Sequence, residues 1–410
     1  MAAMGDRYTV ISADCHGGGQ INDYRDHLEH EYLDDFDAWA ETYAVPFEDL
    51  TGDDGPRNWD SDRRLADLEA DGIVAEVIFP NTIPPFYPKP SLLAQPPPAT
   101  AGDDLEHRWA GLRAHNRWLA DFCARTPGRR AGIAQVMLHD VDAAVDEVRR
   151  AHELGLTGGI LLPGAPPGSG LRPLYAPEYE PLWSVCEELE MPVNHHSGSA
   201  VPDLGEYDVA QVIFLLEVTW WAHRALWHLI AGGVMERHPD LHVVFTEQGS
   251  SWVPETLGTL DYYFGRMQAA AGSQEFEWGA PIQQLSLSPS QYWDRQCHVG
   301  ASFFRPTETH LRHAIGVDSI MWGSDYPHTE ASYPFSREAL RVSFHDVDPT
   351  EITRIVGANA AELYGFDLDA LAPIAARVGP TVAEITEPLT DIPPGAIKCP
   401  AFQPQPATRT

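Results

Sequence analysis

Short apolar segments rich in β-branched residues alternate with helix-forming segments along most of the chain. Eight of them predict strands: residues 8–13, 73–79, 131–138, 158–162, 191–196, 241–246, 296–302 and 319–322. Such a rhythm is typical of parallel βαβ units, and eight units predict a (β/α)8 TIM barrel with helical insertions. An open doubly wound sheet is the alternative, but no G-x-G-x-x-G fingerprint follows a strand.

The barrel is predicted to occupy residues 1–366 as one domain. From Asp367 onward the chain turns rich in proline and ends in PPGAIKCPAFQPQPATRT. This composition predicts an extended C-terminal tail over residues 367–410, lying on the barrel surface or on a partner subunit, and not a second domain.

The charge balance excludes some partners. Lysine and arginine number 27 against 60 aspartates and glutamates, which gives a net charge of −33. Nucleic acid requires a basic face, and an anionic membrane surface attracts basic segments. We therefore expect neither partner, and we expect a small-molecule substrate.

Cysteine usage and hydropathy predict a cytoplasmic protein. Five scattered cysteines form no C-x-x-C pair, which is typical of a reducing compartment. The N-terminus MAAMGDRYTV has no apolar signal core. The most apolar later segment, residues 212–234, contains Glu217, His223, Arg224 and His228, and is too polar to span a bilayer.

The first predicted strand runs into Asp14-Cys15-His16 and then three glycines. Because side chains alternate faces along a strand, Asp14 and His16 point the same way and Cys15 points the other way. A carboxylate and an imidazole that project together form half of a metal site. A simple hydrogen-bonded pair is the commoner arrangement, so the other ligands must come from elsewhere in the chain.

Three later strands end in comparable groups, namely His195-His196, Glu247 and Asp325. Alternation separates the two histidines, and we assign His196 to the barrel mouth because it lies closest to the following Ser-Gly turn. Glu247 alone would serve as a helix cap or ion-pair partner, and Asp325 alone as a turn residue. Catalytic residues of barrels collect at the carboxyl ends of strands, so these groups together predict one shared centre.

The donor set suits one divalent ion bound by Asp14, His16, His196 and Asp325. Zinc or manganese matches two histidines and two carboxylates better than iron does. No lysine at a strand end is placed to bridge a second ion. Glu247 is then left as general acid, general base or substrate-orienting group, with Asp325 as a further catalytic candidate.

Two residues are candidates for substrate binding. Arg305 closely follows a predicted strand and could pair with a substrate carboxylate. His328 lies three residues beyond Asp325 and could reach the barrel mouth. A surface or supporting role explains either residue equally well.

Six stretches carry a resemblance to a known family: ISADCHGGG, RLADLEADGIVAEVIFPN, MPVNHHSG, HVVFTEQGSSWVPE, MWGSDYPH and GANAAELYGF. Together they resemble the amidohydrolase-related family that includes aminocarboxymuconate semialdehyde decarboxylase and aromatic acid decarboxylases. The resemblance runs from the first strand to about Phe366, and it implies a (β/α)8 barrel with one divalent metal. It also implies that Asp14 is an acidic variant of a first-strand ligand. Many members carry a catalytic histidine where this chain has Glu247.

Three functions are open to such a protein. The first is a metal-dependent, non-oxidative decarboxylase of an unsaturated or aromatic carboxylic acid, with Glu247 delivering a proton to carbon as CO2 leaves. The resemblance to members with an acidic first ligand favours it. The second is a hydrolase of a lactone, ester or amide that uses metal-activated water. The third is a non-catalytic binding subunit, against which the retained ligand set argues.

The segment over residues 209–238 predicts one long helix with Trp220, Trp221 and Trp227. A barrel flank usually buries less aromatic surface than this. We therefore predict that this helix forms the interface of a homodimer or a larger homo-oligomer.

Overall fold

The computed structural model describes residues 6–43, 45, 50–81, 84–87, 103–269 and 271–403. Most of the Pro-rich loop expected within residues 80–100 lies outside these ranges, as does the end of the chain from residue 404. Within them, every predicted strand segment contains at least one strand. Their bounds are β1 (Val10–Gly17), β2 (Ile73–Pro80), β3 (Arg130–Gly132), β4 (Ala134–Gln135), β5 (Ile160–Leu161), β6 (Val193–His196), β7 (Val243–Thr246), β8 (Cys297–Ser302) and β9 (Ile320–Gly323).

The strands form two parallel sheets, ordered β1-β2-β3 and β4-β5-β6-β7-β8-β9. The sheets are continuous through β3 and β4, which are two pieces of one strand on either side of Ile133. The Ile133 N–H donates to the Ile78 carbonyl at 3.0 Å, and the Ala134 N–H donates to the Gly159 carbonyl at 2.9 Å. This strand position therefore pairs with β2 on one side and with β5 on the other.

The other seam joins the first strand to the last. Cys15 and Tyr326 form a parallel bridge, and the His16 N–H donates to the Tyr326 carbonyl at 2.6 Å. The Asp325 N–H donates to the Asp14 carbonyl at 2.8 Å. These bonds close the sheet into eight strand positions, so the predicted (β/α)8 barrel is confirmed.

Apolar side chains from several strands fill the barrel, whose longest strands, β1 and β2, are buried at every position. Pairs two residues apart on three strands belong to one buried cluster that also includes residues of the last helices. The strand members are Ile11 and Ala13, Val77 and Phe79, Ala131 and Ile133. The two-residue spacing is that of side chains on one face of a strand, and the strands themselves were predicted from their short apolar runs.

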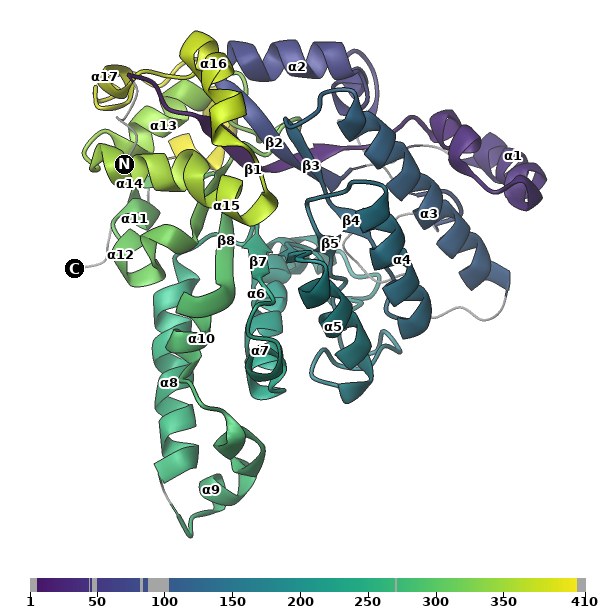
Figure 1. Cartoon of the computed structure of the whole chain (residues 1–410), viewed down its shortest axis with the longest axis vertical. Helices are drawn as coiled ribbons and strands as arrows, with labels where there is room; N and C mark the ends of the chain where they lie inside the picture. Colours follow the sequence, from purple (N-terminus) through teal and green to yellow (C-terminus); the bar gives the residue numbers. More distant parts are fainter. Residues whose placement is uncertain are drawn as a thin grey trace.

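Helices surround the strands, and α8 with α9 extends away from the barrel at the lower end of the view (Figure 1). Aspartate side chains cap the first turns of α2, α4 and α16, as expected for helix starts. The helices are α1 (Leu33–Thr42), α2 (Ser61–Ala70), α3 (Asp103–Ala124), α4 (Val141–Glu153), α5 (Glu180–Glu188), α6 (Ala210–Ala231), α7 (Val234–Arg237), α8 (Trp252–Ala269), α9 (Gln274–Trp278), α10 (Pro289–Gln296), α11 (Pro306–Thr309), α12 (Arg312–Ile315), α13 (Ser336–Phe344), α14 (Pro349–Thr353), α15 (Asn359–Tyr364), α16 (Leu368–Val378) and α17 (Val382–Ile385).

One predicted helix and one predicted strand boundary are wrong. The helix expected over residues 209–238 is split into α6 and α7 by Gly232 and Gly233, because Gly233 adopts a left-handed conformation with φ 71°. The first strand was expected to end at residue 13, but β1 continues to Gly17. Asp14 and His16 therefore lie within the strand and not beyond it.

The tail from Asp367 differs from the extended conformation that was predicted. It begins with α16, whose residues Leu371 and Ala375 are buried, and continues through α17. Phe402, near the end of the described chain, is buried beside Ala339 of α13. The described tail thus packs on its own barrel, since its apolar positions recur at helical spacing. The division of the chain at residue 366 remains a prediction.

None of the helices in the described ranges is long and apolar enough to cross a membrane.

Candidate metal centre at the barrel mouth

Five acidic and imidazole side chains converge at the carboxyl end of the barrel. They are Asp14 and His16 from β1, His196 from β6, Glu247 directly after β7 and Asp325 shortly after β9. The carboxyl ends of parallel strands meet at one face of a barrel, which is why residues so far apart in sequence come together.

The two histidines each lie between two carboxylates. His16 Nε2 is 3.4 Å from Asp14 Oδ1 and 3.2 Å from Asp325 Oδ1. His196 Nε2 is 3.6 Å from Asp14 Oδ1 and 3.2 Å from Glu247 Oε2. The structure thus brings together all four predicted metal ligands and adds Glu247 to the same group.

His328 lies at the edge of this cluster. Its Nε2 is 4.0 Å from Asp325 Oδ1, and its ring centroid is 4.3 Å from that of His16. A quarter of its side chain, 23%, remains exposed. It can therefore face a small molecule at the mouth while touching the buried groups.

The backbone turns sharply beside the ligands. Glu247 and Asp325 have φ values of 56° and 61°, and Phe303 after β8 has a φ of 55°. A non-glycine residue in this left-handed region costs about 1–3 kcal/mol and persists where the surrounding structure enforces it. Such strain is concentrated at functional sites, and here it occurs at three consecutive strand ends of one barrel face.

The donor atoms fit a metal ion. Several buried oxygens and nitrogens of the cluster have no hydrogen-bond partner among the described residues: Asp14 Oδ1, His16 Nε2, His196 Nε2, Asp325 Oδ1 and Asp325 Oδ2. Each unsatisfied buried group costs about 1–3 kcal/mol. A divalent cation bound to these atoms would satisfy them together.

The other ring nitrogen of each histidine is held by the backbone. His16 Nδ1 donates to the Pro80 carbonyl at 3.3 Å, and His196 Nδ1 donates to the Ser197 carbonyl at 3.1 Å. A carbonyl can only accept, so Nδ1 carries a proton, and Nε2 is the ring nitrogen that faces the cluster. This is the orientation expected of metal-binding histidines.

Burial and crowding shift the protonation equilibria. Burial raises the pKa of Asp325 well above its ordinary value, and burial also raises the pKa of Glu247. Burial opposes ionisation of Asp14 as well, but its contacts with His16 and His196 hold its pKa below the ordinary range. Three carboxylates share this small volume, so their full ionisation requires a cation.

His195 points away from the cluster, as strand alternation requires. Its Nδ1 donates to the Leu162 carbonyl at 3.1 Å, and its ring also contacts the Ser199 hydroxyl. Burial lowers the pKa of His195 to about 4, so it is neutral at physiological pH. These contacts give it a structural role.

Arg305 is held at a neighbouring loop. Its Nε donates to Glu308 Oε2 at 3.0 Å, and its side chain is 38% exposed. Glu308 also accepts from the Ser250 N–H at 2.7 Å and from the Ser250 hydroxyl. The Arg305 guanidinium is therefore paired with Glu308. Through its bonds to Ser250, Glu308 also connects the segment after β8 to the loop after β7.

Sequence reasoning assigned no role to Ser302, the last residue of β8. Its hydroxyl donates a hydrogen bond to Asp14 Oδ2, and both residues are buried. Its position at a strand end was the available signal. A serine at a strand end does not by itself predict a hydrogen bond to a residue on a non-adjacent strand.

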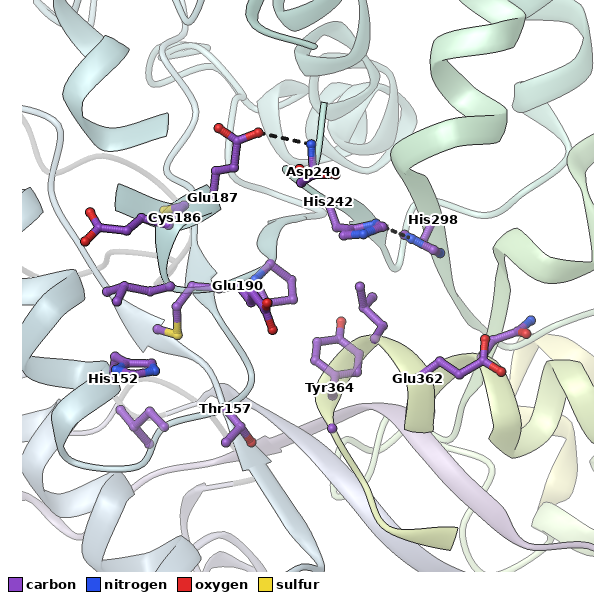
Figure 2. A pocket seen from close by; sticks show the side chains of 18 of the residues that line it. His152, Thr157, Cys186, Glu187, Glu190, Asp240, His242, His298, Glu362 and Tyr364 are labelled. Carbon is purple, nitrogen blue, oxygen red and sulfur yellow. Dashed lines mark hydrogen bonds between the residues drawn. The ribbon is translucent and has the colours of Figure 1, made fainter. Parts of the chain in front are cut away.

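There is also a separate cavity of about 700 Å³, and Figure 2 shows side chains that line it. It is lined by residues at the amino ends of strands, such as Pro192, His242 and His298. His242 Nδ1 and His298 Nε2 are hydrogen bonded at 3.0 Å, as the dashed line between them shows (Figure 2). The cavity lining shares no residue with the cluster, and active sites of barrels lie at the other, carboxyl end.

Comparison with known proteins agrees with this geometry. Residues 88–366 match the amidohydrolase family model. A gamma-resorcylate decarboxylase of Rhodococcus jostii (strain RHA1) is 34% identical over 268 residues, which cover 62% of this chain and 76% of that protein. A 2-amino-3-carboxymuconate-6-semialdehyde decarboxylase of Dictyostelium discoideum is 24% identical over 317 residues, which cover 75% and 77%.

Solved structures share the fold. The crystal structure of 5-carboxyvanillate decarboxylase from Novosphingobium aromaticivorans, complexed with manganese and 4-hydroxy-3-methoxy-5-nitrobenzoic acid, superposes with a TM-score of 0.66 at 20% identity. The alignment covers 87% of this chain and 96% of that one. With its closed parallel barrel, its cluster of ligand atoms at the carboxyl face and the family match over most of its length, the chain belongs to the amidohydrolase family.

Proposed function

We propose that this protein is a metal-dependent, non-oxidative decarboxylase of an aromatic or unsaturated carboxylic acid. The observation that carries the proposal is the group of buried ligand atoms without partners at the barrel mouth. The relatives named above, which are decarboxylases, support the reaction type. A hydroxylated benzoate is the substrate class that these relatives suggest.

We assign the ion to Asp14, His16, His196 and Asp325, with manganese or zinc as the metal. Once bound, such an ion would polarise and orient the oxygen atoms of the substrate. The Nδ1–backbone hydrogen bonds of His16 and His196 fix their rings for this task.

Glu247 is the proposed proton donor. Its side chain is 24% exposed, whereas those of Asp14 and Asp325 are fully buried, so Glu247 is the carboxyl group that reaches from the cluster toward the mouth. The bond from the ring carbon to the carboxylate breaks and CO2 leaves. The electron pair stays on the carbon, which takes the Glu247 proton, and Glu247 then recovers a proton from water.

His328 is the proposed substrate-contacting residue, because it lies beside Asp325 and is partly exposed. Arg305 is also proposed to bind the substrate. Its Nε is bonded to Glu308, so the exposed part of its side chain would make that contact.

The test is product formation by the manganese-loaded protein from a panel of hydroxylated benzoates, including 2,6-dihydroxybenzoate and 5-carboxyvanillate. We expect CO2 release and, in D2O, a product with deuterium on the carbon that carried the carboxylate. Glu247→Gln should retain bound manganese but lose most of the CO2 release. CO2 release by Glu247→Gln at the rate of the unaltered protein would remove Glu247 as proton donor.

Hydrolysis of a lactone, ester or amide is the second candidate. Both carboxylate oxygens of Asp325 lack partners among the described residues, so Asp325 could accept a proton from an attacking water. Proton release from lactones and esters, without CO2 release from any acid of the panel, would favour this reaction.

We also propose that the protein forms a homo-oligomer through α6. Leu215 and Leu216 are 73% and 72% exposed, and Trp220 is 52% exposed. Trp227, in contrast, packs against the core. An apolar face of this kind is typical of a subunit interface. A monomer at micromolar concentration in analytical ultracentrifugation would exclude it. The cytoplasmic location stays a prediction.

A further inference from the structure

The two oxygens of Asp14 have different surroundings. Oδ2 accepts the hydrogen bond from Ser302, whereas Oδ1 faces His16 Nε2 at 3.4 Å and His196 Nε2 at 3.6 Å. Oδ1 is buried and has no hydrogen-bond partner in the described part of the chain. One oxygen is thus occupied by the protein and the other is presented to the cluster.

Ser302 reaches Asp14 across an intervening strand. Ser302 on β8 is in register with Gly323 on β9, and β9 lies between β8 and β1. A Cβ atom at position 323 would lie 2.6 Å from Asp14 Cβ, so only glycine leaves this space open. The hydrogen bond from Ser302 to Asp14 therefore crosses Gly323, where no side chain stands between the two residues.

An aspartate carboxylate needs such a partner to be fixed. Its terminal torsion is broad and roughly two-fold, so the two oxygens exchange places unless one of them is bonded. Groups behind metal ligands hold the ligand atom in place before the ion arrives, and their loss typically weakens metal binding. Ser302 is the described side chain that bonds Asp14 Oδ2.

We propose that Ser302 is a positioning residue that turns Asp14 so that Oδ1, and not Oδ2, meets the metal ion. This inference rests on the metal site of the proposed function. It assigns Ser302 no contact with substrate. The measurable consequence is a change in metal affinity, independent of any substrate or reaction.

The experiment measures the dissociation constant of the apo-protein for Mn²⁺ from the electron paramagnetic resonance signal of free Mn²⁺. Ser302→Ala, which removes one oxygen atom, should weaken binding about 10- to 100-fold. Ser343→Ala is the matched control, because Ser343 is also buried and its hydroxyl donates to the backbone carbonyl of Phe304 and not to a proposed ligand. It should leave the dissociation constant unchanged, and thermal melting of both variants shows that they are folded.

A second measurement separates positioning from a general loss of structure. In an Asp14→Ala background, adding Ser302→Ala should change the Mn²⁺ affinity no further, because Ser302 acts through Asp14. Additive losses would overturn the inference. Equal affinity of Ser302→Ala and the unaltered protein would also overturn it, while leaving the proposed function intact. If the unaltered protein binds no Mn²⁺, the metal site fails and this inference fails with it.

Discussion

The backbone N–H of Asp325 donates a 2.8 Å hydrogen bond to the carbonyl oxygen of Asp14, joining the last strand position of the barrel to the first. The side chains of the same two residues contribute to the ligand cluster. Closing the barrel therefore also assembles the site, because the hydrogen bond between the first and last strand positions fixes the backbone of the two residues that carry these carboxylates.

Replacing Asp325 by asparagine should remove metal binding and activity but keep the fold. Asparagine tolerates the left-handed φ of 61° at this position, so the backbone is retained. The loss of activity should exceed the roughly 10- to 100-fold effect of losing a residue behind a ligand. Metal content by elemental analysis and the thermal transition measure the two effects. A variant that keeps its metal would show that Asp325 is not a ligand.

Replacing Gly323 by alanine should both destabilise the protein and weaken metal binding. The new Cβ would lie 2.6 Å from Asp14 Cβ and 3.2 Å from the Asp14 nitrogen. Overpacking of this kind costs about 1–3 kcal/mol. Gly258→Ala is the control, because position 258 is an exposed site in α8 with no atom within 4 Å of the added Cβ. It should stabilise the helix by about 0.5–1 kcal/mol. Urea unfolding compares the two.

Alanine variants of the two adjacent histidines should differ in how much manganese stabilises them. In the unaltered protein, Mn²⁺ at 100 times its dissociation constant should add about 2.7 kcal/mol to the free energy of unfolding. His196→Ala should lose this gain, because His196 Nε2 faces the carboxylates. His195→Ala should be less stable without metal but should keep the gain, since His195 is bonded to Leu162 and Ser199. Thermal melts with and without Mn²⁺ after chelation decide this, and an equal response of both variants would contradict the assignment.

Stability should depend on pH through Asp71, a buried carboxyl group far from the ligands in the sequence. Burial raises the pKa of Asp71 to about 7 from its ordinary value of 3.8, and the Ser336 N–H donates to its Oδ1 at 3.1 Å. The folded state holds the Asp71 proton more tightly than the unfolded state does. Its contribution to the free energy of unfolding is therefore complete below pH 4 and is lost as the pH rises toward 7. The change amounts to at most about 4 kcal/mol. Asp71→Asn should be free of this loss and more stable than the unaltered protein at pH 8.

Asp348 provides the control of opposite sign. Hydrogen bonds from Thr350 lower the pKa of Asp348, an exposed helix cap, so its contribution is present above the ordinary pKa and is lost on acidification. Asp348→Asn should therefore remove stability at neutral pH and not at pH 3. Unfolding at several pH values checks both variants, and parallel pH profiles for the two would contradict the sign predicted for Asp71.

The strands and the barrel were predictable because they depend on local pattern. Each strand segment is a short apolar run, as expected for strands such as β1 that are buried on both faces. The residue types of the cluster were predictable for the same reason, since Asp14, His196 and Asp325 each lie at or near a strand end. The break at Gly232–Gly233 was not predicted, although a Gly-Gly pair is itself a signal for a turn.

The sequence by itself determined which residues form strands, that the strands are parallel, and which polar groups lie at their ends. Only the tertiary structure decided which donor atoms meet: that Glu247 lies beside the proposed metal ligands, that Arg305 pairs with Glu308, and that Ser302 reaches Asp14 across Gly323, which has no side chain in the way. The physical reason is that strand formation depends on neighbours in the chain, whereas these contacts depend on register and on closure of the seam between β1 and β9.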